Sequence, residues 1–303
     1  MTEQKTAFKS GFVALIGRPN VGKSTLLNHL VGDKVSIVSP KPQTTRNKIL
    51  GILTDDESQI VFVDTPGLHK PRTRLGEYME RTAQEATKAI DLICMLVDAT
   101  KVQPADHEIA RALIKDQAPR FLLINKLDLV HPQQILPVIA SFSEDGFEEI
   151  LPISARTGEG CDRLLQFIRQ RLPQGPLYYP KDMWTDQTER QMASEIIREK
   201  ALLNLREEIP HGIGVEILSF KTIERAGGDD LTEIHATVYC DREGHKRIII
   251  GQRGQMLQAI GSQARQSLEL LLGTQVNLQL WIKVRPNWRD NMNDLRTLGY
   301  TDD

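Results

Sequence analysis

With 303 residues, the chain is long enough for two domains that each have a hydrophobic core. Its 40% apolar and 26% charged residues exclude a disordered chain, and its net charge of −2 gives no sign of nucleic-acid binding through bulk charge. No apolar run is long enough to span a membrane, and residues 1–10 lack the apolar region of a signal peptide. The cysteines Cys94, Cys161 and Cys240 lie far apart, so we expect reduced thiols of a cytoplasmic protein.

A phosphate-binding loop is predicted at the first strand. The apolar residues 12–16 favour a buried strand, and a helical pattern follows with Leu26, Leu27 and Leu30 on one face. Between them lies the pattern Gly, four residues, Gly-Lys-Ser, whose backbone N–H groups cradle phosphates while the lysine reaches the β and γ phosphates and the serine holds Mg²⁺. We expect the nucleotide to contact Gly17, Arg18, Pro19, Asn20, Val21, Gly22, Lys23, Ser24 and Thr25.

The polar residues 32–47 contain two prolines and no periodicity, so they form a loop. This loop is either an exposed connector or a switch segment in which a threonine hydroxyl completes the Mg²⁺ shell when a γ-phosphate is present. The pair Thr44 and Thr45 is placed for that role.

Strands are expected at residues 48–53 and 59–63, and the second ends in Asp64, Thr65, Pro66 and Gly67. An aspartate at the end of such a strand orients Mg²⁺, usually through water, and Gly67 can donate its N–H to the γ-phosphate. A plain Asp-Pro-Gly turn is the alternative.

A base-reading element is predicted after the strand 121–124, which delivers Asn125, Lys126 and Asp128. Guanine offers N1–H and N2–H₂ on one edge, and the two oxygens of Asp128 can accept both, whereas adenine offers neither donor; sites of this kind discriminate by about 10⁴–10⁵. We expect Asn125 to tie the phosphate loop and Lys126 to lie along the base. An ATPase or nucleoside kinase would fit the phosphate loop but not this element.

The strand 150–153 leads to Ser154, Ala155 and Arg156, whose backbone would face the guanine carbonyl. Helices at 74–88, 105–115 and 161–171 alternate with the strands, including one at 91–97. This alternation predicts an α/β domain over residues 1–172 with a mostly parallel sheet, whose strand ends carry the ligand.

Hydrolysis is expected to be slow without a partner. Leu68 stands where a Ras-type enzyme has the glutamine that orients water, and leucine cannot hydrogen-bond water. Asn20 can bind K⁺ in place of an arginine finger, or it can be a plain loop-stabilising amide. The residues expected to support hydrolysis are Asn20, Lys23, Thr45, Asp64 and Gly67.

A proline-rich linker is expected at residues 173–187, before a second domain at 188–303 with a C-terminal tail. This domain begins with a helix at 188–208 and strands at 214–223 and 233–239. The core of a KH domain is predicted next: a basic and apolar segment at 244–250, the loop Gly251–Gly254, a helix at 255–272 and a strand at 276–284. In such a domain the glycine loop clamps about four nucleotides.

Local charge supports RNA binding, because residues 242–289 hold eight Lys or Arg against two acids, a net charge of +6. Trp281 lies in an apolar strand and is expected in the core, whereas Trp288 could stack on a base. The predicted RNA contacts are Lys246, Arg247, Gly251, Gln252, Arg253, Gly254, Arg265, Lys283, Arg285, Trp288 and Arg289.

The motifs Gln43–Arg46 and Asp64–Pro71, joined to a C-terminal Gly251–Gly254 loop, resemble the bacterial Era family, the Era-like subgroup of the TrmE-Era-EngA GTPases. The residues 188–208 and Ile209–Gly212 are also similar. The resemblance covers nearly the whole chain and implies a phosphate-loop GTPase domain followed by an α+β type II KH domain.

The resemblance also implies a GTP-switched assembly factor for the small (30S-type) ribosomal subunit that binds its ribosomal RNA near the 3′ end. Ser24 and Thr45 would be the Mg²⁺ ligands, and GTP/GDP, Mg²⁺ and K⁺ the cofactors. A monomer in the cytoplasm, with peripheral contact to the inner face of the cytoplasmic membrane, is implied as well. The alternative is an RNA-binding module with a weakly hydrolytic regulatory nucleotide site that acts on another RNA.

Overall fold

The computed structural model describes residues 7–41, 43–67, 73–86, 89–115, 117–206, 209–225 and 230–300. Leu68, and with it the expectation about the attacking water, lies outside the described residues. The chain divides into two compact units. The first unit lies within residues 1–36, 45–70 and 79–186, and the second within 37–44, 71–78 and 187–303.

The first unit is built on a six-stranded sheet in the order β2-β3-β1-β4-β5-β6. All neighbouring strands are parallel except β2 and β3, which confirms the predicted mostly parallel sheet. The strands are β1 (Lys9–Ile16), β2 (Ile49–Thr54), β3 (Ser58–Asp64), β4 (Leu92–Asp98), β5 (Arg120–Asn125) and β6 (Glu149–Pro152). The central strands are apolar on both faces because helices cover both faces of such a sheet.

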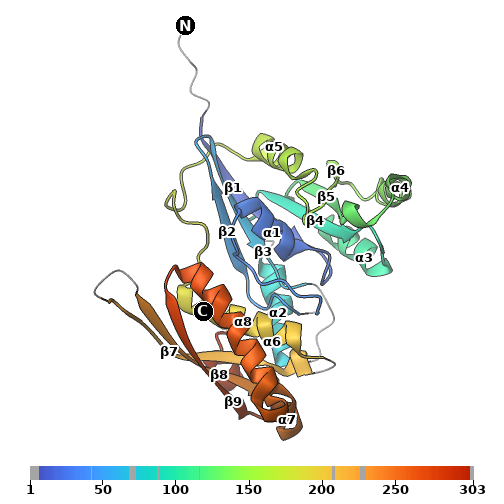
Figure 1. The fold of residues 1–303 in the computed structure, drawn as a ribbon. Coiled ribbons are helices and arrows are strands. Elements are labelled where there is room, and N and C mark those ends of the chain that lie inside the picture. Colours follow the sequence, from blue (N-terminus) through green and yellow to red (C-terminus); the bar gives the residue numbers. More distant parts are fainter. Residues whose placement is uncertain are drawn as a thin grey trace. The chain divides into compact units, whose positions relative to one another are not determined.

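Helices α1 and α5 pack on one face of this sheet, and α3 and α4 pack on the other (Figure 1). The helices in this part of the chain are α1 (Lys23–Val31), α2 (Arg74–Glu85), α3 (Pro104–Leu113), α4 (Ile135–Ser141) and α5 (Cys161–Arg171), with short 3₁₀ turns η1 (Leu127–Leu129) and η2 (Pro132–Gln134). Residues 74–78 of α2 are assigned to the second unit. The sequence analysis missed α4, because Pro137 interrupts its pattern. A proline is tolerated there since it lies in the first turn.

The predicted linker packs on the first unit. Gln174 pairs with Lys9 and Thr185 pairs with Gly51 as isolated β-bridges. The Thr185 hydroxyl also donates to the Leu50 carbonyl at 2.8 Å. From residue 187 onward the chain belongs to the second unit, to which residues 37–44 and 71–78 also belong.

The second unit has a three-stranded sheet in the order β7-β8-β9, with β7 and β8 antiparallel and β8 and β9 parallel. Helices α6 and α8 bury its apolar face. Its elements are α6 (Glu189–Asn204), η3 (Ile209–Gly212), β7 (Gly214–Ile223), β8 (Leu231–Cys240), α7 (Glu243–Ile250), η4 (Gln252–Gly254), α8 (Gln255–Leu272), β9 (Gln275–Val284), η5 (Trp288–Asp290) and α9 (Met292–Thr297). This is the predicted order of strand, short segment, glycine loop, long helix and strand, and the short segment is the helix α7.

Among the described residues, no helix combines the length and the apolar character needed to cross a membrane.

Candidate functional site: a nucleotide loop and a glycine-loop groove

The loop between β1 and α1 has the conformation of a phosphate cradle. Gly17 and Gly22 have φ values of 151° and 106°, which side-chain-bearing residues rarely adopt. A Cβ atom on Gly22 would lie 2.1 Å from the Asn125 amide nitrogen. Lys23 curls back over the loop, and its Nζ donates to the carbonyls of Gly17 at 3.0 Å and Arg18 at 3.1 Å. Burial lowers the pKa of Lys23 to about 8.

A cluster of oxygen atoms faces this loop from the end of β3. Asp64 Oδ2 accepts hydrogen bonds from the hydroxyls of Ser24 at 2.7 Å and Ser36 at 3.1 Å. The Thr45 hydroxyl lies 3.0 Å from that of Ser24. Asp64 Oδ1 is buried and has no hydrogen-bond partner among the described residues, and burial raises the pKa of this carboxyl. Hard oxygen ligands around an unsatisfied carboxylate oxygen fit Mg²⁺.

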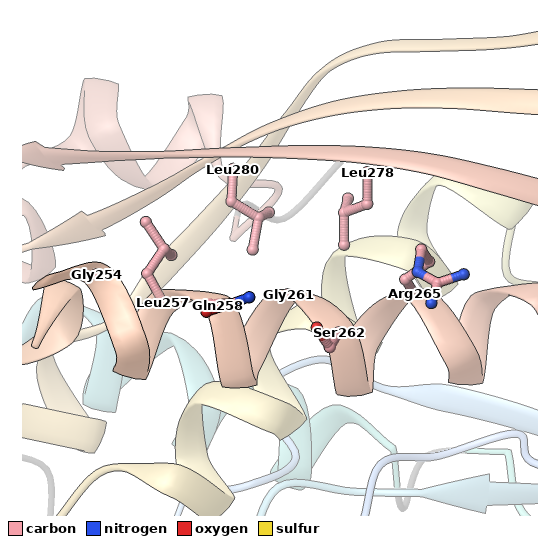
Figure 2. Close-up of a pocket in the computed structure, with 8 residues that line it drawn as sticks. All are labelled: Gly254, Leu257, Gln258, Gly261, Ser262, Arg265, Leu278 and Leu280. Atoms are coloured by element: carbon pink, nitrogen blue, oxygen red, sulfur yellow. The ribbon is translucent and has the colours of Figure 1, made fainter.

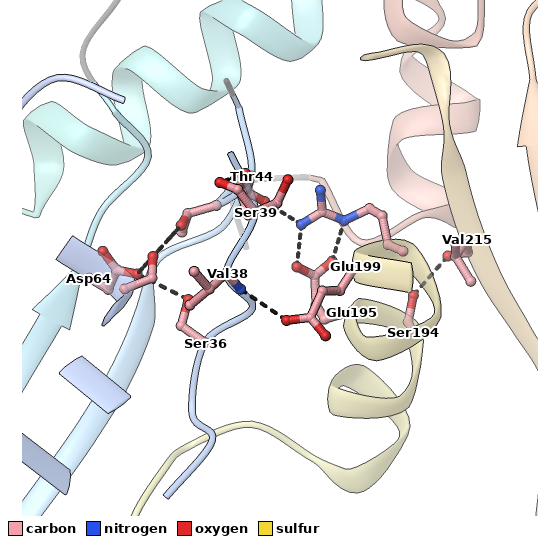
Figure 3. Close-up of polar contacts among 12 residues, drawn as sticks. Ser36, Val38, Ser39, Thr44, Asp64, Ser194, Glu195, Glu199 and Val215 are labelled. Carbon is pink, nitrogen blue, oxygen red and sulfur yellow. Dashed lines mark hydrogen bonds and ion pairs between the residues drawn. The ribbon is translucent and has the colours of Figure 1, made fainter. Parts of the chain in front are cut away.

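The two threonines of the switch loop point to different partners. Thr45 faces the oxygen cluster, whereas the Thr44 hydroxyl donates to the Lys41 carbonyl at 2.6 Å within its own loop. Figure 3 shows Asp64 bonded to Ser36 and, within the second unit, Val38 bonded to Glu199. The Thr44 hydroxyl is thus engaged within its own loop.

Gly67 and Thr65, which follow β3, contact the phosphate loop and the strand that leads into it. A Cβ atom on Gly67 would lie 2.7 Å from the Pro19 nitrogen, so only glycine allows this approach to the phosphate loop. The Thr65 hydroxyl donates to the Leu15 carbonyl at 3.0 Å and therefore fastens the strand end.

Asn125 joins three parts of the nucleotide site. Its Nδ2 donates to the Val21 carbonyl at 2.8 Å, and its Oδ1 accepts from the Ala155 N–H at 2.9 Å. The expectation that Asn125 ties the phosphate loop is confirmed. Lys126 has a φ of 74°, and its Nζ lies 2.5 Å from Asp98 Oδ2 at the end of β4.

The carboxylate of Asp128 lies between two donors. The Ser154 hydroxyl donates to Oδ1 at 2.5 Å, and Arg156 donates to Oδ2 from Nε at 2.9 Å and from Nη2 at 2.5 Å. These hydrogen bonds, first that of Ser154 and then that of Arg156, lower the pKa of Asp128. The carboxylate is thus held ionised, as an acceptor of two base donors must be.

Arg18, one of the predicted nucleotide contacts, is engaged by a side chain from α3. Arg18 is only 15% exposed in its side chain, and it forms a two-point ion pair with the fully buried Asp106 at 2.7 and 2.9 Å. Asp106 also caps α3 by accepting from the N–H of Gln103 at 2.8 Å. Sequence reasoning missed Asp106, and an acidic third residue of a helix that begins with proline was the available signal.

Two other polar residues of the site were also missed. Ser36 bonds Asp64, and Asp98 bonds Lys126. Asp98 could have been found, since it ends a parallel strand next to β5, as Asp64 ends β3.

The second unit carries a groove beside its glycine loop. Gly251 and Gly254 have φ values of 72° and 81°, and Arg253 between them has 49°. The groove has a volume of about 400 Å³. Figure 2 shows Leu278 and Leu280 of β9 pointing toward α8. The lining residues are Gly254, Leu257, Gln258, Gly261, Ser262, Arg265, Leu278 and Leu280.

The predicted RNA contacts do not all lie at this groove. Arg247 and Arg253 are exposed on α7 and the glycine loop, and Arg265 lines the groove. Lys283 alternates with Leu280 and Ile282 on β9, so it lies on the opposite face of the sheet. Arg285 stacks 3.9 Å from the centre of the Tyr239 ring.

Two more side chains in that part of the chain are held by ion pairs. Arg285 pairs with Asp294 at 3.2 Å, and Arg289 pairs with Asp241 at 3.1 Å. Neither arginine therefore extends toward the groove as the charge count suggested.

Both tryptophan predictions were wrong. Trp288 is fully buried, and its Nε1 donates to the Gly212 carbonyl at 2.9 Å, so it offers no face to a base. Trp281 is 42% exposed, on the sheet face away from the helices, and contacts His235 edge-to-face. Trp288 lies in η5 and bonds Gly212, whereas Trp281 alternates with Leu280 and Ile282 along β9 and so takes the face of the sheet away from the helices.

Comparisons with known proteins agree with this geometry. A family model described as "50S ribosome-binding GTPase" matches residues 12–126, and a KH-domain model matches residues 208–289. The chain is 53% identical to the GTPase Era of Caldicellulosiruptor saccharolyticus over 297 residues, which cover 97% of this chain and 98% of that protein. It is 50% identical to the GTPase Era of Ruminiclostridium cellulolyticum over 296 residues, with coverage of 97% and 98%.

The chain belongs to the Era family of GTPases. Two solved Era structures match with a TM-score of 0.92 and 43% identity over 97% of this chain and 100% of theirs. One is Era in complex with MgGDPNP and nucleotides 1506–1542 of 16S ribosomal RNA, and the other is an Aquifex aeolicus Era variant bound to GDP·AlF₄⁻. The predicted Era-type architecture, a GTPase domain followed by a C-terminal KH domain, is confirmed for this Era protein.

Proposed function

We propose that this Era GTPase uses GTP binding and hydrolysis to control its binding to the 3′ region of small-subunit ribosomal RNA, and so assists maturation of that subunit. The observation that carries the proposal is the coexistence of a guanine-type carboxylate site and a glycine-loop groove in one chain. A similar Era protein was solved with MgGDPNP and a 16S ribosomal RNA fragment.

The phosphates bind in the loop at the start of α1. Backbone N–H groups of residues 20–24 at the N-terminus of α1 face the anion, and Lys23 leaves its two loop carbonyls to reach the β and γ phosphates. The hydroxyls of Ser24 and Thr45 would hold Mg²⁺, and Asp64 would orient the water bound to it. When bound, the ion neutralises charge that develops on the phosphates.

Guanine binds over Asp128. The carboxylate accepts hydrogen bonds from N1–H and N2–H₂ of the base, and Asn125 and Ala155 hold the loops beside it. Burial of Asn125 and its two bonds makes the base loop and the phosphate loop one rigid frame.

We infer that Asn20 binds K⁺ during hydrolysis. Asn20 is an exposed residue of the phosphate loop with a φ of 64°, and its side-chain amide oxygen is a hard ligand of the kind that an alkali cation takes. A cation there would supply the effect of an arginine finger, about 10³–10⁵ in rate. Equal turnover in Na⁺ and K⁺ buffers, with and without RNA, would contradict this role.

RNA binds along the groove between α8 and β9. The glycine loop lets the sugar-phosphate backbone approach the main chain beside Arg253, and Arg265, paired with Glu269, lies at the other end of the groove (Figure 2). The apolar wall of Leu257, Leu278 and Leu280 suits unstacked bases, so single-stranded RNA is the expected ligand.

The switch loop offers a route for control. Ser36 and Thr45 bond Asp64 in the first unit, whereas the residues between them belong to the second unit, where Arg198 donates to the Thr44 carbonyl. Thr45 directly follows Thr44 in the chain. If Mg²⁺ and the γ-phosphate fix the position of Thr45, they therefore also restrain Thr44, whose carbonyl is bonded by Arg198 of α6. We infer that GTP and GDP states differ in RNA affinity.

We also infer a monomer in the cytoplasm, with peripheral contact to the membrane.

The test is crosslinking of the protein to RNA in cells, followed by sequencing of the bound fragments. Reads concentrated at the 3′ end of the small-subunit RNA support the proposal, and reads concentrated on another RNA support the alternative of a regulatory RNA-binding module. A second test measures the RNA affinity of Gly254→Asp, which should fall because the new carboxylate stands where phosphate approaches. Gly254→Asn is the matched control, because asparagine tolerates the same positive φ without the charge. Equal RNA affinity in GTP and GDP would refute the switch.

A further inference from the structure

Arg156 already holds the carboxylate that reads guanine. Its Nε and Nη2 donate to Asp128 Oδ2 at 2.9 and 2.5 Å, while the Ser154 hydroxyl donates to Oδ1 at 2.5 Å. The side chain of Asp128 is 10% exposed and that of Arg156 is 69% exposed. A largely solvated guanidinium therefore covers an almost buried acceptor.

The guanidinium and the guanine edge offer the same chemistry. Nε–H and Nη2–H of arginine are two parallel N–H donors on one planar group. N1–H and N2–H of guanine are also two parallel donors on one plane. Both can meet a carboxylate at two points, so they compete for Asp128.

The other oxygen of the Asp128 carboxylate has a different partner, and Lys126 pairs with another carboxylate. Ser154 holds Oδ1 from the loop after β6, and Lys126 is turned to Asp98. The Arg156 pair is the contact with Asp128 that can open toward solvent, because the arginine side chain is the exposed member.

We propose that Arg156 is a placeholder for guanine: in the nucleotide-free protein it occupies Asp128, and it has to leave that carboxylate when the base enters. The inference rests on the proposed role of Asp128 as the guanine reader. Arg156 keeps the acceptor satisfied and oriented without nucleotide, and it slows association because one ion pair must break first. Since exposed ion pairs are weak, the effect is about two- to fivefold.

Stopped-flow binding of mant-GDP to the full chain tests this with Arg156→Lys. Lysine keeps the positive charge that attracts phosphate but loses the two-donor plane. The expected result is an association rate raised about two- to fivefold with an unchanged dissociation rate. The ratio of the variant's association rate to that of the wild type should fall toward one at high salt, where the ion pair is screened.

Arg171→Ala is the matched control. Arg171 forms a comparable exposed ion pair with Glu148 at 2.7 Å in the same unit, away from the nucleotide loops. Its removal should leave both rate constants of mant-GDP unchanged, and an equal acceleration in this variant would overturn the proposal.

Two further outcomes separate the inference from the proposed function. A faster dissociation rate with unchanged association in Arg156→Lys shows that Arg156 contacts bound nucleotide, which overturns the placeholder role. Asp128→Asn tests the guanine reader by the ratio of GDP to XDP affinity. If that ratio shifts and Arg156→Lys has wild-type rates, the placeholder alone is wrong; if the ratio does not shift, the reader role fails and the placeholder role fails with it.

Discussion

Replacement of Asn125 by alanine should destabilise the first unit and leave the second unit intact. Asn125 is 2% exposed, and its partners Val21 and Ala155 are 1% and 3% exposed. Alanine removes the donor at 2.8 Å from the Val21 carbonyl and the acceptor at 2.9 Å from the Ala155 N–H. Each buried group left without a partner costs about 1–3 kcal/mol. The free energy of unfolding of the first unit should therefore fall by about 2–6 kcal/mol.

Hydrogen exchange of the nucleotide-free protein, followed by mass spectrometry of peptides, measures this loss for each unit separately. Core amides of β5 and α1 exchange through opening of the first unit, and those of β8 report the second unit in the same sample. Exchange in β5 and α1 should accelerate by about tenfold for each ~1.4 kcal/mol lost, with β8 unchanged.

Asn204→Ala is the matched control, because Asn204 also makes two side-chain hydrogen bonds of 2.8 Å, to the Lys200 carbonyl and to Gln263, but near solvent. Water can replace both, so exchange in β8 should change by less than the equivalent of about 1 kcal/mol. If Asn125→Ala lowers the free energy of unfolding by as little as Asn204→Ala does, the two buried hydrogen bonds do not contribute the stability assigned to them.

Asp128→Asn replaces an acceptor with a donor and should shift nucleotide preference from GTP toward XTP, measured by competition; unchanged GTP affinity would contradict the base-reading role. Thr45→Ala should weaken Mg²⁺-dependent GTP binding and hydrolysis, whereas Thr44→Ala should not, because only Thr45 faces the Asp64 carboxylate; similar losses in both would argue against this division. Trp288→Phe should lower the stability of the second unit by about 1–3 kcal/mol, because it leaves the Gly212 carbonyl without its buried donor, and RNA affinity measured in the folded variant should hold.

The sequence by itself determined the nucleotide site. The loop at residues 17–24, Asp64 and the element at 125–128 each follow a continuous apolar run, and a run of this kind forms a strand buried on both faces. In a parallel sheet such strands end at one edge, so their order along the chain was enough to bring the motifs together. The helix at 255–272 was likewise predicted with its observed bounds, because Gly254 and Gly273 mark its ends.

Only the tertiary structure decided which polar groups pair and which aromatic rings are covered. Arg18 meets Asp106 across 88 positions and Arg156 meets Asp128 across 28, and no local pattern relates such residues. Burial of Trp288 depends on Gly212, 76 positions away. Periodicity determines which side chains share a face of an element, whereas the packing of other segments determines which faces are covered, and that is why the basic residues of the second unit fall on two faces of its sheet.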